Sequence, residues 1–195
     1  MVGIGAEEDR VPRRGNSLSR AVGKALLRLC GWRIEGEFPN VPKCVAIAAP
    51  HTSNWDFFFT ICVVFALRLR VDWIGKHTLF RWPFGWFMRL LGGTPINRQE
   101  SEGVVEQIVE TMSSRDSFIL ALAPEGTRSR VDRWKTGFYR VAVQAGVPIL
   151  MAYIDYERKA IGFGPTFEPA GDIMSEMEEI RNFYRGKTAR YPAQF

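Results

Sequence analysis

Two short apolar runs that each stop at a proline constrain the fold of this chain more than any other feature. Residues 44–49 end at Pro50, residues 118–123 end at Pro124, and a polar loop follows each proline. Short apolar runs with β-branched residues are typical of buried strands. Because helix-like segments alternate with the strand-like ones, we predict a single α/β domain with a mostly parallel mixed sheet flanked by helices, plus an N-terminal amphipathic helix.

The same patterns predict the order of the elements along the chain. Hydrophobic periodicity indicates strands at 33–37, 44–49, 71–75, 94–98, 118–123 and 147–154, and a strand pair at 158–168. It indicates helices at 17–32, 55–68, 100–114, 137–145 and 172–186. Residues 1–16 are polar and charged, which predicts disorder, so the domain itself is expected over 33–195.

The first polar loop contains a histidine and an aspartate that could act together. His51 and Asp56 are five positions apart, and a regular helix would turn them onto different faces. If Ser53 or Asn54 caps a helix that starts there, His51 lies in the loop and Asp56 in the first turn, within reach. The carboxylate would then orient the imidazole and leave its second nitrogen free as a base. The alternative interpretation is a capping corner with a partly exposed histidine.

The net charge and the cysteine content limit the classes of protein to which this chain can belong. The chain has a net charge of +5, and residues 10–33 carry seven basic residues and no acidic one. A basic face suits nucleic acid or an anionic membrane surface, but no nucleic-acid-binding motif is present. The three cysteines, an odd number without metal-type spacing, are expected to be reduced core residues. No metal is needed for the chemistry, and His77 is expected to be structural or peripheral.

Two segments are candidates for contact with a membrane surface. In residues 17–32 basic residues repeat on one helical face, and another face holds the apolar residues Leu18, Ala21, Val22, Ala25 and Leu29. Residues 79–91 are dense in aromatic residues with Arg81 and Arg89 among them, which suits the headgroup region. The alternatives are an ordinary amphipathic helix with a solvated basic face, and core packing of the aromatic rings. No leader-type apolar core precedes residue 17, and no apolar run reaches the length of a spanning helix.

The loop residues resemble the glycerolipid acyltransferase family, typified by 1-acylglycerol-3-phosphate acyltransferase. The pattern His51-x4-Asp56 is followed about 70 positions later by residues 125–129, Glu-Gly-Thr-Arg-Ser. Residues 93–98 and 147–149 resemble two lesser blocks of that family. The order and spacing of the four blocks over residues 40–155 are those of the family.

The resemblance implies acyl transfer from acyl-CoA or acyl carrier protein to a lipid hydroxyl, without a cofactor. His51 would be the general base and Asp56 would orient it. The implied acceptor-binding residues are Glu125, Gly126, Thr127, Arg128, Arg98 and Lys76. A peripheral location on the cytoplasmic face of the inner or plasma membrane is implied, with an anionic membrane surface and a lysolipid as partners and no nucleic acid.

Two departures from the family pattern leave the acceptor open. Pro50 precedes the histidine where the family often has asparagine, and Thr78 replaces a glutamate in the block near Lys76. Lysophosphatidate is the default acceptor, and another lysolipid or an amino-lipid is the alternative. A lipid-binding module without chemistry, and thioester hydrolysis with water in place of the alcohol, are further hypotheses.

Overall fold

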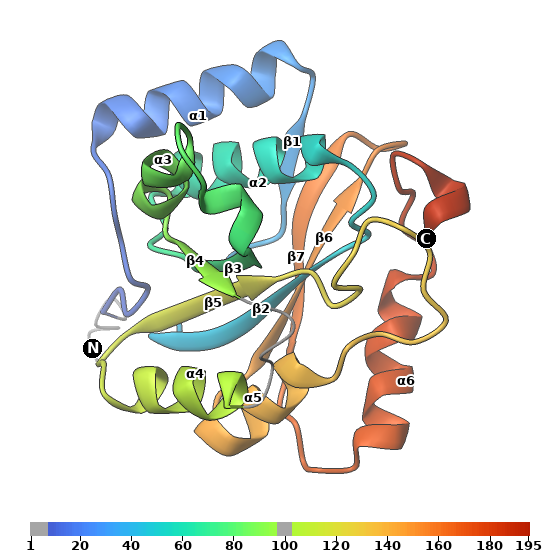
Figure 1. Cartoon of the computed structure of the whole chain (residues 1–195). Helices are drawn as coiled ribbons and strands as arrows, with labels where there is room; N and C mark the ends of the chain where they lie inside the picture. Colours follow the sequence, from blue (N-terminus) through green and yellow to red (C-terminus); the bar gives the residue numbers. More distant parts are fainter. Residues whose placement is uncertain (1–7, 97–102) are drawn as a thin grey trace, which may run out of the picture.

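A seven-stranded sheet with the order β1-β7-β6-β2-β5-β3-β4 forms the centre of the protein (Figure 1). The structure is a computed structural model and describes residues 8–96 and 103–195. The strands are β1 (Arg33–Glu35), β2 (Lys43–Ala49), β3 (Asp72–Lys76), β4 (Gly93–Ile96), β5 (Phe118–Leu122), β6 (Ile149–Asp155) and β7 (Ala160–Phe167). Neighbouring strands are parallel except β6 and β7. The predicted α/β fold with a mostly parallel mixed sheet is confirmed.

Helices cover both faces of this sheet. They are α1 (Ser17–Leu29), α2 (Asn54–Leu67), α3 (Gly85–Leu90), α4 (Val104–Ser113), α5 (Gly137–Ala145) and α6 (Ile173–Tyr184), with 3₁₀ turns η1 (His77–Phe80) and η2 (Pro192–Gln194). In Figure 1, α1, α2 and α3 lie above the sheet and α4, α5 and α6 below it. The expected strand pair at 158–168 is wrong as a hairpin, because β7 is one strand, antiparallel to β6. The alternative, a bulged edge, holds for the irregular pairing, since the register shifts between Leu150 and Ala152, but β7 lies between β1 and β6 and is not at the edge.

Strand β2 is central and buried on both faces. Val45, Ile47 and Ala49 pack into the core that includes α5 residues, and Cys44 and Ala46 pack on the opposite side. A strand that is apolar on both faces belongs inside a parallel sheet covered by helices. The loop that follows β2 therefore starts from a strand that is buried on both faces.

Helix α1 packs directly on α2, and Gly23 permits this close approach. A Cβ atom at Gly23 would lie 2.5 Å from the backbone oxygen of Cys62 and 2.6 Å from the backbone nitrogen of Ala66. Leu27 is the other buried residue of α1. Cys44 and Cys62 are buried as expected, whereas Cys30, just after α1, is exposed. The expectation that all three cysteines are core residues is wrong for Cys30, because α1 ends on the surface.

The segment before α1 is ordered where the structure describes it. Val11 is buried, and the backbone of Arg13 forms a β-bridge with Leu69. The backbone nitrogen of Arg14 donates to the oxygen of Arg68 at 2.8 Å. The disorder expected for 1–16 is therefore wrong for residues 8–16, because the buried side chains of Val11 and Pro12 and the backbone pairing anchor them. Residues 1–7 lie outside the described residues.

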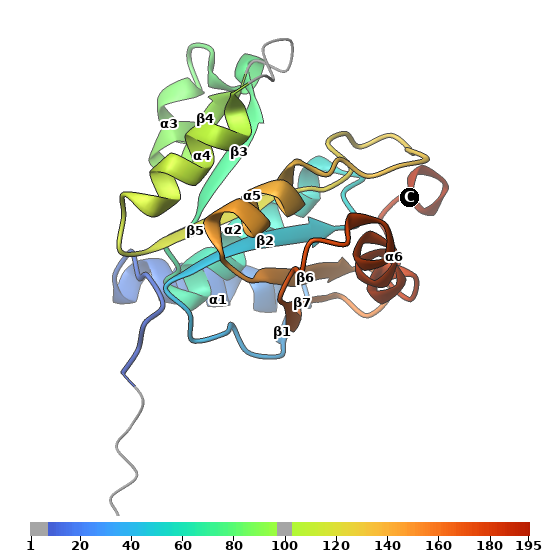
Figure 2. The same cartoon turned by 90° about the horizontal axis from the view of Figure 1, so that it is seen from below.

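The loops after β2 and β5 leave the sheet at the same edge, because these parallel neighbours pair in register. The loop after β5 and the C-terminal segment lie side by side at this edge (Figure 2). Within residues 8–96 and 103–195, no helix combines the length and the apolar character that a bilayer crossing requires.

Candidate active site

The corner between β2 and α2 is built around the N-cap of the helix. Ser53 is the N-cap and accepts a hydrogen bond from the backbone nitrogen of Trp55 at 3.2 Å. Asp56, in the first turn, accepts on Oδ2 from the backbone nitrogens of Thr52 at 2.8 Å and Ser53 at 2.7 Å. This is the reciprocal arrangement of a capping box. The carboxylate of Asp56 is thus fixed by backbone groups that the helix start would otherwise leave unpaired.

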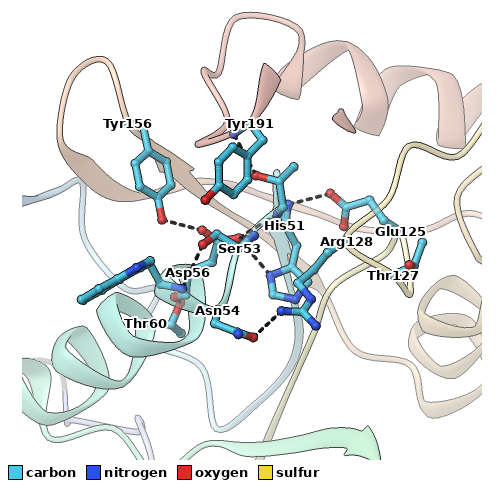
Figure 3. Close-up of polar contacts among 12 residues, drawn as sticks. His51, Ser53, Asn54, Asp56, Thr60, Glu125, Thr127, Arg128, Tyr156 and Tyr191 are labelled. Carbon is cyan, nitrogen blue, oxygen red and sulfur yellow. Dashed lines mark hydrogen bonds and ion pairs between the residues drawn. The ribbon is translucent and has the colours of Figure 1, made fainter. Parts of the chain in front are cut away.

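His51 and Asp56 are brought together as the cap predicts (Figure 3). The imidazole Nδ1 lies 3.2 Å from Asp56 Oδ2. The side chain of Asp56 is 5% exposed and that of His51 is 30% exposed, so the carboxylate is buried while part of the imidazole is accessible to solvent. A proton on Nδ1 that is donated to Asp56 leaves Nε2 with a free lone pair. Nε2 of His51 can therefore accept a proton from a molecule that binds at this edge of the sheet.

Asp56 remains ionised despite its burial. Burial alone would raise the pKa of its carboxyl group, but hydrogen bonds from His51, Tyr156 and the backbone of Ser53 outweigh it and hold the pKa below its ordinary value. Its position in the first turn of α2 also places the negative charge at the favourable end of the helix dipole. A stable carboxylate is what an orienting partner of a histidine base requires.

Glu125 supports the histidine loop from the neighbouring strand. Its Oε1 accepts a hydrogen bond from the backbone nitrogen of His51 at 2.9 Å. The residue is buried, and among the described residues its Oε2 has no hydrogen-bond partner. Burial raises the pKa of Glu125 to about 6. The carboxylate is turned toward His51 rather than outward, and a role in acceptor binding stays a prediction.

The rest of the second loop carries an arginine that reaches the first loop, and a threonine hydroxyl. Gly126 has a φ of +66°, a conformation that favours glycine. Thr127 is half-buried and Arg128 is exposed, with the Arg128 guanidinium donating to Asn54 Oδ1 across the two loops. The arrangement places an arginine at the mouth of the site, where it can bind an anionic group.

Of the two remaining predicted site residues, Lys76 is not joined to this cluster. Lys76 ends β3 and is exposed; among the described residues it makes no hydrogen bond or ion pair with the two loops. Arg98 lies outside the described residues. His77, expected to be peripheral, begins η1 and is exposed.

Two further residues reach the site from the C-terminal part of the chain and were not predicted. The hydroxyl of Tyr156 donates to Asp56 Oδ1 at 2.6 Å, and the backbone nitrogen of Tyr191 donates to Thr52 Oγ1 at 3.3 Å. Tyr156 directly follows β6, whose neighbour in the sheet is β2. Its position just beyond a predicted strand was the signal that could have indicated it.

The arrangement offers acid–base chemistry and anion binding. Among residues 8–96 and 103–195, no three His, Cys, Asp or Glu side chains are grouped so that they could hold a metal ion. A base oriented by a carboxylate, beside an arginine, can deprotonate a hydroxyl whose molecule carries a negative charge.

Comparison with known proteins places residues 33–155 in a single match to the family model "Acyltransferase". The chain is 30% identical over 151 residues to the 1-acyl-sn-glycerol-3-phosphate acyltransferase of Escherichia coli, covering 72% of this chain and 60% of that protein. It is 27% identical over 135 residues to the enzyme of the same name from Haemophilus influenzae, covering 64% and 55%. The chain thus spans little more than half the length of these relatives.

The fold is also similar to that of a solved structure. The crystal structure of the 1-acyl-sn-glycerophosphate acyltransferase from Thermotoga maritima superposes with a TM-score of 0.57, covering 85% of this chain and 75% of that chain. The sequence identity is 18%, so this likeness concerns the fold.

Proposed function

Because the chain belongs to the acyltransferase family, we propose that it transfers a fatty acyl group to a hydroxyl of a lysophospholipid. The donor is a thioester, acyl-CoA or acyl carrier protein, and lysophosphatidate is the default acceptor. The names of the two relatives from Escherichia coli and Haemophilus influenzae support this acceptor. The observation that carries the proposal is the 3.2 Å separation of His51 Nδ1 from a buried Asp56 carboxylate.

In the proposed reaction His51 is the general base. Its Nε2 takes the proton of the acceptor hydroxyl as that oxygen attacks the thioester carbonyl carbon. The carbon–sulfur bond then breaks, and the thiolate leaves and takes the proton from the imidazolium. Asp56 stabilises the imidazolium in between and holds the ring in place. Assistance of this kind accelerates a reaction by roughly 10²–10⁴-fold.

The acceptor headgroup is proposed to bind at the second loop. Arg128 is exposed at the mouth of the site, and its guanidinium is linked to Asn54 at the start of α2. Guanidinium groups bind phosphate through paired hydrogen bonds. Thr127 adds a hydroxyl in the same loop. A phosphate held here would place a neighbouring glycerol hydroxyl near His51.

The reaction is proposed to take place at an anionic membrane surface, on the cytoplasmic face. Three apolar residues of α1 support this location, because they are exposed: Leu18 is 71% exposed, Val22 42% and Leu29 83%. Lys24 and Arg28 lie beside them on the same helix. An exposed apolar stripe flanked by cations is typical of a helix that lies in the headgroup layer.

The aromatic segment offers a second contact with the same surface. Trp82 is 92% exposed, and Phe84 and Trp86 are each 67% exposed. Arg81 and Arg89 are interleaved with them. In Figure 1, α3 lies above the sheet with α1. Large exposed aromatic side chains beside cations suit the boundary between water and lipid.

The alternatives are an acyltransferase with an amino-lipid acceptor and a lipid-binding module without chemistry. The deciding experiment measures free thiol released from a panel of acyl-CoAs, with and without a mixture of lysolipids, for the wild type and His51→Ala. Acceptor-dependent release that is lost in the variant would support the acyltransferase. Binding of lysolipid without thiol release from acyl-CoA or acyl carrier protein would favour the module instead. Release that needs no acceptor would identify a thioesterase.

A further inference from the structure

Tyr156 and His51 occupy different oxygens of one carboxylate. The Tyr156 hydroxyl donates to Asp56 Oδ1 at 2.6 Å (Figure 3). Oδ2 of the same carboxylate lies 3.2 Å from His51 Nδ1 and accepts both backbone hydrogen bonds of the helix cap. The two oxygens thus have different partners: Oδ2 contacts the histidine and the helix cap, and among the described residues Oδ1 accepts its side-chain hydrogen bond from the phenol.

Tyr156 is itself held from several sides. Its ring packs edge-on against Trp32, with ring centroids 5.0 Å apart, and its backbone nitrogen donates to the oxygen of Thr188 at 2.9 Å. The guanidinium of Arg190 lies 5.8 Å from the ring centroid. Burial and the neighbouring Asp56 raise the pKa of the Tyr156 phenol, so the phenol stays protonated and is the donor. Because these contacts fix the position of Tyr156, its hydroxyl can hold the Asp56 carboxylate in one orientation.

We propose that Tyr156 is a positioning residue of the active site, which holds the Asp56 carboxylate and withdraws part of its negative charge from His51. The proposal rests on the proposed function, in which His51 is the base. Tyr156 lies one position beyond the segment matched by the family model, which ends at residue 155. It is brought to the site by the pairing of β6 with β2.

The consequence concerns the pH range in which the base is active. A hydrogen bond to a carboxylate lowers the charge density that a neighbouring imidazolium experiences. Without the phenol, Asp56 favours the protonated imidazole more strongly, so a higher pH is needed to free the base. The other charged groups that face the pair are Glu125 behind the His51 backbone, and Arg128 and Arg190 on the outer side. Removal of the Tyr156 hydroxyl leaves the charges of Glu125 and Arg128 in place. Arg190 also interacts with this hydroxyl and loses that contact, but its guanidinium stays charged.

The test compares two Tyr→Phe variants of the full chain. Tyr156→Phe removes the hydroxyl on Asp56 and keeps the ring. The matched control is Tyr153→Phe, which removes a hydroxyl that donates to Glu35 at 2.7 Å, away from the histidine. For Tyr156→Phe we expect kcat/KM at neutral pH to fall about tenfold, less than the loss expected for removal of the base itself. We also expect the pH of half-maximal kcat/KM on the acidic side to move upward. The control should show neither change.

A merely structural role predicts a different pattern. A loss by the same factor at every pH, with the acidic midpoint unmoved, would overturn the proposal, and so would a downward shift. Failure of Tyr156→Phe to fold, measured by circular dichroism, would assign the phenol a structural role and also overturn it.

A second readout does not depend on acyl transfer. The chain has two histidines, so the imidazole C2–H resonances of His51 and His77 can be assigned in proton NMR with a His77→Gln variant. In a pH titration without substrate, Tyr156→Phe should move the midpoint of the His51 resonance upward and leave that of His77 in place. An unmoved His51 midpoint overturns the positioning role. A shift in a protein that transfers no acyl group would leave the positioning role intact and count against the proposed function alone.

Discussion

Glu125 Oε1 accepts a hydrogen bond from the backbone nitrogen of His51 at 2.9 Å, so a residue of the second loop supports the histidine of the first. The contact joins the loop after β5 to the loop after β2, and these two strands are parallel neighbours in the sheet. It explains why the two loops belong to one site although 74 positions separate the residues. It also means that the glutamate holds the backbone of the histidine and leaves the imidazole free.

The buried carboxyl group of Glu125 should make stability depend on pH. Its pKa is raised from 4.5 to about 6 by burial, so the native state binds the proton more tightly than the unfolded state. Stability from this group is fully present below pH 4.5 and is lost as pH rises through 6. Relative to Glu125→Gln, the wild type should therefore lose up to about 2 kcal/mol of unfolding free energy over this interval. Urea unfolding at several pH values measures the difference.

The control for this series is Glu178→Gln, an exposed glutamate of α6. The urea series is repeated with it over the same pH values. If the difference between wild type and Glu125→Gln stays level from pH 4.5 to 7, burial does not govern this carboxyl group.

Arg128 should determine the affinity for an acceptor that carries phosphate. Arg128→Lys keeps the charge but loses the planar fork that pairs with phosphate oxygens. We expect the KM for lysophosphatidate to rise about tenfold, which corresponds to about 1.4 kcal/mol, with a smaller change in kcat. For monoacylglycerol, which lacks the phosphate, the two proteins should be alike. Arg130→Lys, a change in an exposed neighbour, is the control. Equal effects of Arg128→Lys on both acceptors would contradict a phosphate site.

Local signals in the sequence predicted the His51–Asp56 pair, whereas the contacts of Glu125 and Tyr156 depend on packing between segments that are far apart in the sequence. The histidine–aspartate pair was predictable because a capping box and a proline-terminated strand are both local. The inward turn of Glu125 depends on the register of β5 against β2, and Tyr156 reaches Asp56 from 100 positions away. Most helices and strands followed from periodicity, but α3 and the single strand β7 did not, and neither did the face of α1 that packs inward.

Helix α1 shows why its packed face could not be predicted. The expected apolar face was Leu18, Ala21, Val22, Ala25 and Leu29, and the structure leaves all five exposed. The helix instead packs through Gly23 and Leu27, on the opposite side. A glycine carries no apolar signal, yet it permits the backbone contact with α2. As the alternative interpretation expects, the helix lies on the domain with its basic residues exposed, but the face that packs is not the apolar one.

The contact through Gly23 should not tolerate a methyl group. Alanine normally stabilises a helix by about 1 kcal/mol relative to glycine. At position 23 its Cβ would lie 2.5 Å from a backbone oxygen of α2, so we expect Gly23→Ala to destabilise the protein by about 1–3 kcal/mol. Gly137→Ala in α5, where nothing lies within 4 Å of the added Cβ, is the control and should be neutral or stabilising. Urea unfolding that finds Gly23→Ala as stable as Gly137→Ala would show that α1 does not pack closely on α2.

The outward stripe of α1 should bind membranes without contributing to stability. Its three large side chains are Leu18, Val22 and Leu29, each exposed. Burial of one such side chain in lipid is worth up to about 1.5–3 kcal/mol. Their combined replacement by serine should therefore weaken binding to anionic vesicles by at least about tenfold, measured by sedimentation with vesicles of phosphatidylglycerol and phosphatidylethanolamine. The unfolding midpoint should stay unchanged, because these side chains contact little of the domain.

Leu27, a buried residue of the same helix, should contribute to stability and not to membrane binding. Leu27 is 4% exposed and packs between α1 and α2. Leu27→Ala should cost roughly 2–5 kcal/mol of unfolding free energy and leave the vesicle affinity of the folded protein as it is. The two variants thus separate membrane contact from folding within one helix. If the serine variant binds vesicles as tightly as the wild type, the stripe is not the membrane contact, and the exposed aromatic residues around Trp82 and Trp86 become the segment to change.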